Sequence, residues 1–261
     1  MIRPVVLTIA GHDPSGGAGV TADQRVIEAI GGTAVSAVTA ITVQNTQGVR
    51  SIHATDPTVL AAQIAVLFED CDIKAVKIGM LGGIAQVAAV TEALRRFRPP
   101  IVVVDPVLAS TGGTPLLDDA GTNALLFDLV PVCDVITPNL DEAARLTGVR
   151  VTDQESMLEA GQILLNRGAH WVVVKGGHLC GDPVDLLLSN GDEPVIFASS
   201  RIVTDHSHGT GCFLSSAIAA YLASGLSMVD AVRASREILR LALGNPLVIG
   251  SGRGYPRINY V

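Results

Sequence analysis

The chain has 261 residues, of which 48% are hydrophobic and only 3% aromatic, and its formal net charge is −7. A chain of this length buries one large α/β core and is short for two, so a single domain over residues 1–261 is expected. The acidic balance argues against nucleic acid as a partner, because a polyanion-binding face needs clustered Lys and Arg. The sequence shows neither a membrane-length apolar run nor a secretion signal, so we predict a cytoplasmic protein with no membrane partner.

Short apolar runs rich in β-branched residues recur along the chain and alternate with helix-length stretches. The predicted strands are 4–10, 36–44, 75–81, 101–107, 134–139 and 171–177. Because these strands are apolar on both faces, the pattern predicts a three-layer αβα sandwich: a mostly parallel sheet with helices on both faces. A hairpin of 184–190 and 194–203 is expected at one end of the sheet, followed by helices at about 210–224 and 227–244.

Polar or glycine-rich residues follow most of these strands. The stretches are GHDPSGGAG (11–19), VQNT (43–46), KIGML (77–81), DPV (105–107), TPNLDE (137–142), KGGH (175–178) and HGTGC (208–212). Ligands bind at the carboxyl ends of the strands in sheets of this kind. A sheet that served only as a scaffold would not need so many such ends, so the active site is expected at this edge.

The stretch HGTGC points to phosphoryl chemistry. Gly209 and Gly211 are predicted to adopt positive φ and to turn backbone N–H groups toward one point, at the positive end of the following helix. That arrangement is an anion hole suited to a moving phosphoryl group. The alternative is a tight turn with a buried Cys212. Lys175, followed by two glycines, suits a phosphate contact, and its alternative is a solvated strand end.

Hard oxygen donors follow two further strands. Asp105, Asn139 and Glu142 supply two carboxylates and an amide, which suit Mg²⁺ held through a few contacts and several waters. The same residues could instead cap helices. The stretch 11–19 lacks the lysine of a Walker loop, so its glycines are expected to close backbone N–H groups over a small substrate.

Taken together, these motifs resemble the ribokinase-like superfamily and, within it, the hydroxymethylpyrimidine/phosphomethylpyrimidine kinases of thiamine biosynthesis. The motifs that carry the resemblance, in the family's order, are LTIAGHDPSGGAGVTAD (7–23), TVQNTQGV (42–49), KIGML (77–81), ITPNLDEA (136–143), VVKGGH (173–178) and HGTGC (208–212). The similarity covers nearly the whole chain. Only the last dozen residues, GSGRGYPRINYV (250–261), carry no part of it.

The resemblance implies an enzyme that uses ATP and Mg²⁺ to phosphorylate 4-amino-5-hydroxymethyl-2-methylpyrimidine and then its monophosphate, as a homodimer. It assigns the catalytic site to Gly209, Gly211, Cys212 and Lys175, the substrate site to Gln44, Met80, Val107, Gly11 and Asp23, the ATP site to Asn139, Lys175 and Thr210, and the metal to Asp105 and Glu142. Cys212 stands where the wider superfamily usually has an aspartate base.

Two of these assignments make physical sense from the side chains alone. The amide of Gln44 offers a donor beside an acceptor, which matches the exocyclic amine and the adjacent ring nitrogen of an aminopyrimidine. A helix N-terminus could lower the pKa of the Cys212 thiol enough for it to accept a proton, although phosphoryl transfer depends mostly on positioning. One departure is Gln24, where many relatives have a lysine, and any role of that lysine is in doubt.

Two other functions remain open. A pyridoxal kinase of the same fold is the alternative enzyme, but pyridoxal has no exocyclic amine for Gln44 to bind. A catalytically silent pyrimidine-binding module is the alternative from another class. The lysine, the carboxylates and the glycine loop argue against it, because binding alone does not need the equipment for phosphoryl transfer.

Overall fold

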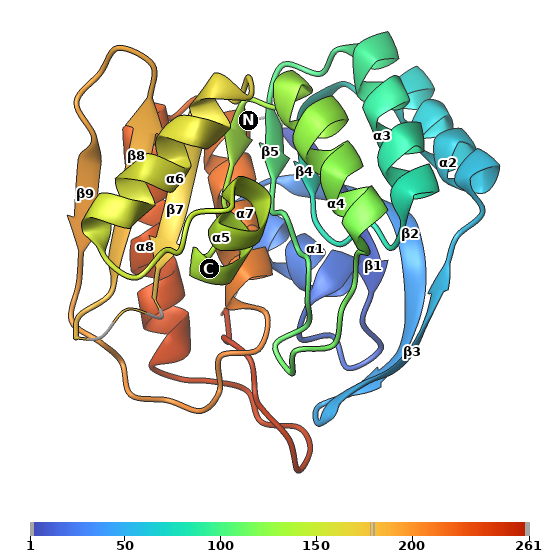
Figure 1. Ribbon diagram of the computed structural model, residues 1–261. Coiled ribbons are helices and arrows are strands. Elements are labelled where there is room, and N and C mark those ends of the chain that lie inside the picture. Colours follow the sequence, from blue (N-terminus) through green and yellow to red (C-terminus); the bar gives the residue numbers. More distant parts are fainter. Residues whose placement is uncertain (1–2, 178, 180, 259–261) are drawn as a thin grey trace.

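A computed structural model of the chain describes residues 3–177, 179 and 181–258, so His178 of the VVKGGH motif lies outside the described residues. The strands form one nine-stranded sheet in the order β3-β2-β1-β4-β5-β6-β7-β8-β9 (Figure 1). They are β1 (Val5–His12), β2 (Thr33–Asn45), β3 (Gly48–Ala54), β4 (Ile73–Ile78), β5 (Val102–Val104), β6 (Val135–Ile136), β7 (Trp171–Gly176), β8 (Val184–Ser189) and β9 (Val195–Ala198). The helices are α1 (Gly19–Ala29), α2 (Pro57–Asp70), α3 (Ile84–Phe97), α4 (Asp119–Ala124), α5 (Leu140–Thr147), α6 (Gln154–Asn166), α7 (Thr210–Ala223) and α8 (Met228–Leu243).

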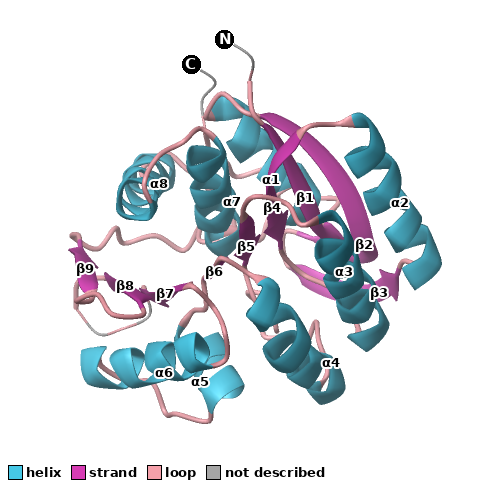
Figure 2. Cartoon of the chain, turned by 90° about the horizontal axis from the view of Figure 1, so that it is seen from above, coloured by secondary structure: helices cyan, strands magenta, loops and turns pink. Residues whose placement is uncertain are grey.

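The sheet is parallel from β2 through β7 and antiparallel at both edges. Neighbouring residues of a strand enter different cores because side chains alternate across a sheet. Leu7 packs with α2, α3, α5 and α6 on one face, whereas Val6 packs with α1, α7 and α8 on the other. Figure 2 shows α7 and α8 on one side of the strands and α3, α5 and α6 on the other. The predicted three-layer α/β class is therefore confirmed.

The sheet differs from the prediction mainly at its first edge. The strand predicted over 36–44 is longer, and β3 returns antiparallel beside it, which the sequence analysis did not predict. Asn45 makes this turn, because its Oδ1 accepts from the N–H groups of Gln47 at 2.9 Å and Gly48 at 3.3 Å. We call residues 40–54 the flap, and Figure 1 shows it extending beyond the rest of the sheet.

The central strands end at the edge where the predicted site residues lie. The strands predicted over 101–107 and 134–139 are short, Val102–Val104 and Val135–Ile136, so Asp105 begins the loop after β5 and Asn139 ends the loop between β6 and α5. The predicted hairpin and the last two helices are present as β8, β9, α7 and α8. Among the helices of the described residues, none combines the length and the apolar character needed to cross a membrane.

Candidate active site

A buried ion pair lies under the carboxyl ends of the central strands. The Nζ of Lys77, on β4, lies 2.9 and 2.8 Å from the two carboxylate oxygens of Asp23, on α1. Both side chains are fully buried, and the hydroxyls of Thr8 and Ser216 donate to the same carboxylate at 2.5 and 2.8 Å. Burial alone would lower the pKa of Lys77, but Asp23 raises it above its ordinary value, so the lysine is charged.

Asp23 was predicted to bind substrate, and the structure corrects that prediction. The side chain has no exposed surface with which to contact a ligand. It is a counter-ion for Lys77, a residue that the sequence analysis did not single out. The available signal was a lysine inside the otherwise apolar run AVKIGML.

A second charged cluster brings together Lys175, Asp105 and Glu142. The Nζ of Lys175 donates to Asp105 Oδ1 at 2.7 Å and lies 3.9 Å from Glu142 Oε2, and Thr137 donates to Asp105 at 3.2 Å. Burial raises the pKa of Glu142 to about 7, against the opposing effect of Lys175, while Asp105 adds to the rise. This carboxyl is therefore protonated more readily than an exposed glutamate.

Glu142 and Asn139 also cap α5. The Asn139 side chain accepts from the N–H of Glu142 at 2.9 Å, and the Glu142 side chain accepts from the N–H of Asn139 at 2.8 Å. The capping alternative considered for these residues is thus present. Within the described part of the chain, no group of three or more His, Cys, Asp or Glu side chains is placed to hold a metal ion. Two carboxylates still fit Mg²⁺, which commonly takes one or two of them and completes its shell with waters and phosphates.

The glycines of HGTGC have different roles. Gly209 has φ 76°, and a Cβ there would collide with the carbonyl oxygen of Gly17, so only glycine fits. Gly211 was also predicted to have positive φ, and that prediction is wrong, because it lies in the first turn of α7 outside the left-handed region. A Cβ on Gly211 would lie 3.3 Å from both Asp105 Oδ2 and Lys175 Nζ. Glycine there lets the helix start approach the charged cluster closely.

Cys212 and Thr210 complete this helix start. Burial raises the pKa of the Cys212 thiol to about 11; Lys77 opposes the rise, and Asp23 and Asp105 add to it. The expected lowering by the helix N-terminus is therefore wrong, and the thiol is neutral at neutral pH. Thr210 is half-buried, and its hydroxyl donates to the Ser207 carbonyl at 3.2 Å.

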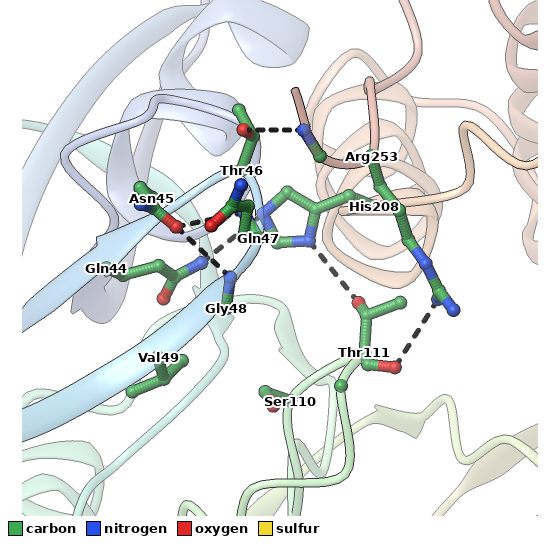
Figure 3. Close-up of a pocket in the computed structure, with 12 residues that line it drawn as sticks. Gln44, Asn45, Thr46, Gln47, Gly48, Val49, Ser110, Thr111, His208 and Arg253 are labelled. Atoms are coloured by element: carbon green, nitrogen blue, oxygen red, sulfur yellow. Dashed lines mark hydrogen bonds between the residues drawn. The ribbon is translucent and has the colours of Figure 1, made fainter. Parts of the chain in front are cut away.

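Gln44 lies at the end of β2 beside a histidine network (Figure 3). Its Nε2 is 3.4 Å from His208 Nε2, which lies 2.9 Å from Asp13 Oδ2, while His208 Nδ1 is 3.3 Å from the Thr111 hydroxyl. Burial would raise the pKa of Asp13, but hydrogen bonds from His208 and Ser15 hold it below its ordinary value. His208 and Asp13 were within quoted motifs, yet only the fold shows that they meet.

A cavity of about 330 Å³ opens beside this network. Gln44, Thr111, His208 and Arg253 are among its lining residues, and Figure 3 shows them around one space. The predicted apolar contacts of the substrate lie together nearby. Gly11 approaches Met80 so closely that a Cβ would be 2.8 Å from its sulfur. Met80 belongs to a small apolar cluster. Val107 packs against this cluster, and so does Ile52 from the flap.

Comparison with known proteins places the chain among kinases of similar size. The profile described as phosphomethylpyrimidine kinase matches residues 13–257. A hydroxymethylpyrimidine/phosphomethylpyrimidine kinase of Rhizobium meliloti is 43% identical over 253 residues, which cover 96% of this chain and 95% of the relative.

Solved structures give the same result for the fold. The crystal structure of phosphomethylpyrimidine kinase from Clostridium difficile 630 is 37% identical, covers 92% of this chain and 100% of its own, and has a TM-score of 0.83. The pyridoxal kinase from Staphylococcus aureus in complex with AMP-PCP and pyridoxal is 28% identical, covers 100% and 95%, and has a TM-score of 0.91. These similarities confirm the predicted ribokinase-like fold. The higher sequence identity lies with the pyrimidine kinases.

Proposed function

This chain belongs to the phosphomethylpyrimidine kinase family and is an ATP-dependent kinase of hydroxymethylpyrimidine and its monophosphate; we propose that its glycine loop and charged clusters perform the transfer as follows. In the first reaction the oxygen of the substrate hydroxyl attacks the γ-phosphorus of ATP, the bond to the leaving ADP oxygen breaks, and the hydroxyl proton passes to an oxygen of the transferred phosphoryl group or to water. In the second, a phosphate oxygen of the monophosphate attacks in the same way. The observation that carries the assignment is the start of α7, where Gly211 lies against Asp105 and Lys175.

The helix start and Lys175 bind the transferring phosphoryl group. Backbone N–H groups in the first turn of α7 lack partners within the helix and point toward its N-terminus, where the helix dipole also favours an anion. The Lys175 ammonium, held at 2.7 Å by Asp105, adds a fixed positive charge at the same place. Such preorganised donors stabilise charge that develops in the transition state.

The residues that would hold Mg²⁺ and ATP lie in and next to this cluster. Asp105 and Glu142 would hold the metal through its waters, and Asn139 and Thr210 would contact the nucleotide. Bound Mg²⁺ neutralises phosphate charge. The chain itself keeps these two carboxylates and the Lys175 ammonium at fixed positions. For Glu142, the hydrogen bonds with Asn139 at the start of α5 do this.

The acceptor ring lies between Gln44 and the apolar cluster. Gln44 pairs with the exocyclic amine and ring nitrogen, and Met80 and Val107 contact the ring, while Gly11 lets the Met80 side chain lie close to the backbone. Cys212 contacts the substrate hydroxyl as a neutral thiol, since its pKa is raised to about 11. The second acceptor is a phosphate monoester that is already mostly ionised at pH 7, so it needs no base.

An assay of ATP consumption tests this proposal. The purified chain is offered the aminopyrimidine alcohol, its monophosphate and pyridoxal, and the products are resolved by mass. We expect the two pyrimidines to be phosphorylated with higher kcat/KM than pyridoxal. Pyridoxal as the better substrate would contradict the role of Gln44.

We also propose that residues 1–261 act as one domain and that the enzyme is a cytoplasmic homodimer. The exposed apolar side chains Ile41 and Val43 on the flap support a subunit contact there. Light scattering after gel filtration measures the mass directly. A mass of 27.0 kDa at micromolar concentration, the mass of one chain, would contradict the dimer.

A further inference from the structure

The C-terminal segment 245–258, which we call the strap, includes most of the residues that were predicted to carry no family resemblance, but the family profile extends to residue 257. In GSGRG (250–254) the glycines alternate, and each lies where a side chain would not fit. A Cβ on Gly250 would be 2.6 Å from the Thr46 hydroxyl, and one on Gly252 would collide with the Thr46 carbonyl. A Cβ on Gly254 would be 2.7 Å from the Leu247 carbonyl. Gly250 and Gly252 therefore let the strap backbone lie directly against the flap, and Gly254 lets the strap fold closely on itself.

Hydrogen bonds fix the strap in this position. The N–H groups of Arg253 and Gly252 donate to the carbonyl and hydroxyl of Thr46 at 2.9 and 3.1 Å. On its other side, the N–H of Gly254 donates to His206 Nδ1 at 3.0 Å, and the N–H of His208 donates to the Gly254 carbonyl at 3.3 Å. The strap thus joins the flap that carries Gln44 to the loop that carries His208.

This fixed backbone presents Arg253 to the cavity. Its side chain is exposed, it lines the same cavity as Gln44, and its Nη1 donates to the Thr111 carbonyl at 3.4 Å (Figure 3). One weak contact occupies one of the five N–H donors of a guanidinium. Among the described residues that line the cavity, Arg253 is the one with a permanent charge.

Two other cations near the site have acidic partners. Lys77 pairs with Asp23, and Lys175, which is assigned to the transferring phosphoryl group, lies between Asp105 and Glu142. The second acceptor brings a phosphate group into a site that must also hold the phosphates of ATP. An additional cation in the cavity therefore favours that substrate and gives no such advantage to the uncharged alcohol.

We propose that Arg253 binds the phosphate of the monophosphate acceptor and so determines how well the enzyme performs the second transfer. The inference rests on the proposed function. On the pyrimidine, the phosphate-bearing substituent is attached to the ring carbon next to the one that carries the amine. A ring held by Gln44 through that amine therefore has its phosphate on the same side of the cavity. A planar guanidinium suits this group because it can donate two parallel hydrogen bonds to a phosphate.

The test compares kcat/KM for the alcohol and for the monophosphate in Arg253→Gln, Arg253→Lys and the wild type. For Arg253→Gln we expect the ratio of monophosphate to alcohol kcat/KM to fall roughly 10-fold or more, mostly through KM, because charge-assisted hydrogen bonds to an anion are lost. Arg253→Lys keeps the charge but loses the fork, so its ratio should be intermediate. Arg257→Gln removes the same charge from the same strap outside the cavity, and its ratio should match the wild type.

The outcomes separate this inference from the proposed function. Equal losses on both acceptors, or an unchanged ratio with an unchanged melting temperature, would overturn the role of Arg253. An Arg257→Gln ratio that falls as far as that of Arg253→Gln would also overturn it, because the effect would then be one of overall charge. A wild-type protein that phosphorylates neither pyrimidine would instead contradict the proposed function.

Discussion

Replacing Gly211 with alanine tests whether the close approach of α7 to the charged cluster serves catalysis. Gly211 is helical, so alanine meets no backbone strain and gains up to about 1 kcal/mol of helix propensity. The new Cβ would lie 3.3 Å from Asp105 Oδ2 and Lys175 Nζ, a tight contact that side-chain shifts of a few tenths of an ångström relieve. The two effects oppose each other. We expect stability to change by less than about 1 kcal/mol, or roughly 2–4 °C in Tm.

Activity should respond far more strongly than stability. The methyl group pushes Lys175 and Asp105 away from the helix start and covers part of the phosphoryl-binding site. Loss of one preorganised donor typically costs on the order of 10²-fold in rate, so we expect kcat to fall roughly 10- to 100-fold. Cys212→Ser keeps the size and a hydroxyl contact. Because the native thiol is already neutral, this variant should lose at most about 10-fold.

The assay is kcat at saturating ATP and pyrimidine, with Tm measured on the same samples. Gly244→Ala is a matched control, because Gly244 ends α8 with φ −69° and an alanine there makes only ordinary contacts. It should leave kcat unchanged. An inactive Cys212→Ser beside an active Gly211→Ala would refute the reasoning and make the thiol an obligatory base.

Three further predictions follow from the same contacts. Gln44→Leu leaves the amine and ring nitrogen unpaired at roughly 1–3 kcal/mol per group, so kcat/KM should fall more for the pyrimidine than for pyridoxal, and equal losses would remove Gln44 from specificity. Glu142→Gln can still accept the capping hydrogen bond, so it should fold but need more Mg²⁺ for half-maximal rate; a metal titration that overlays the wild type would leave Glu142 only its capping role. Lys77→Met strands a buried carboxylate and should cost about 3–5 kcal/mol in urea unfolding, whereas Lys74→Met breaks an exposed pair and should cost about 1 kcal/mol or less; equal costs would contradict the account of the buried pair.

The fold was largely predictable because its signals are local. Strands apolar on both faces, separated by helix-length stretches, have few arrangements other than a covered parallel sheet. The missed strand β3 lacks that signal, since most of its side chains are half-buried or exposed and show no core-facing period. The turn at Asn45 and the pairing with β2 specify this strand. Neither of them leaves a hydrophobic pattern in the sequence of β3.

The site was predictable in position more than in detail. Strand ends converge at one edge of a parallel sheet, so the gathering of Lys175, Asp105 and Glu142 followed from the topology. Lys77 and Asp23 are 54 residues apart in the sequence, so no local pattern predicts that they pair. Their interaction also depends on the burial of both side chains, which only the fold shows. The pKa of Cys212 was predicted with the wrong sign because the helix start was considered without the desolvation that exceeds it.

The raised pKa of Cys212 also bears on why a cysteine stands where the wider superfamily usually has an aspartate base. The first acceptor is an alcohol, for which a base has some use, but the second is a phosphate that already carries negative charge. An ionised carboxylate beside that acceptor would repel it, and the repulsion is largest in a buried site of low effective dielectric. A half-buried thiol whose pKa is about 11 stays neutral and imposes no such penalty. A neutral group at position 212 can therefore serve both transfers, at the expense of base catalysis in the first, which phosphoryl transfer needs least.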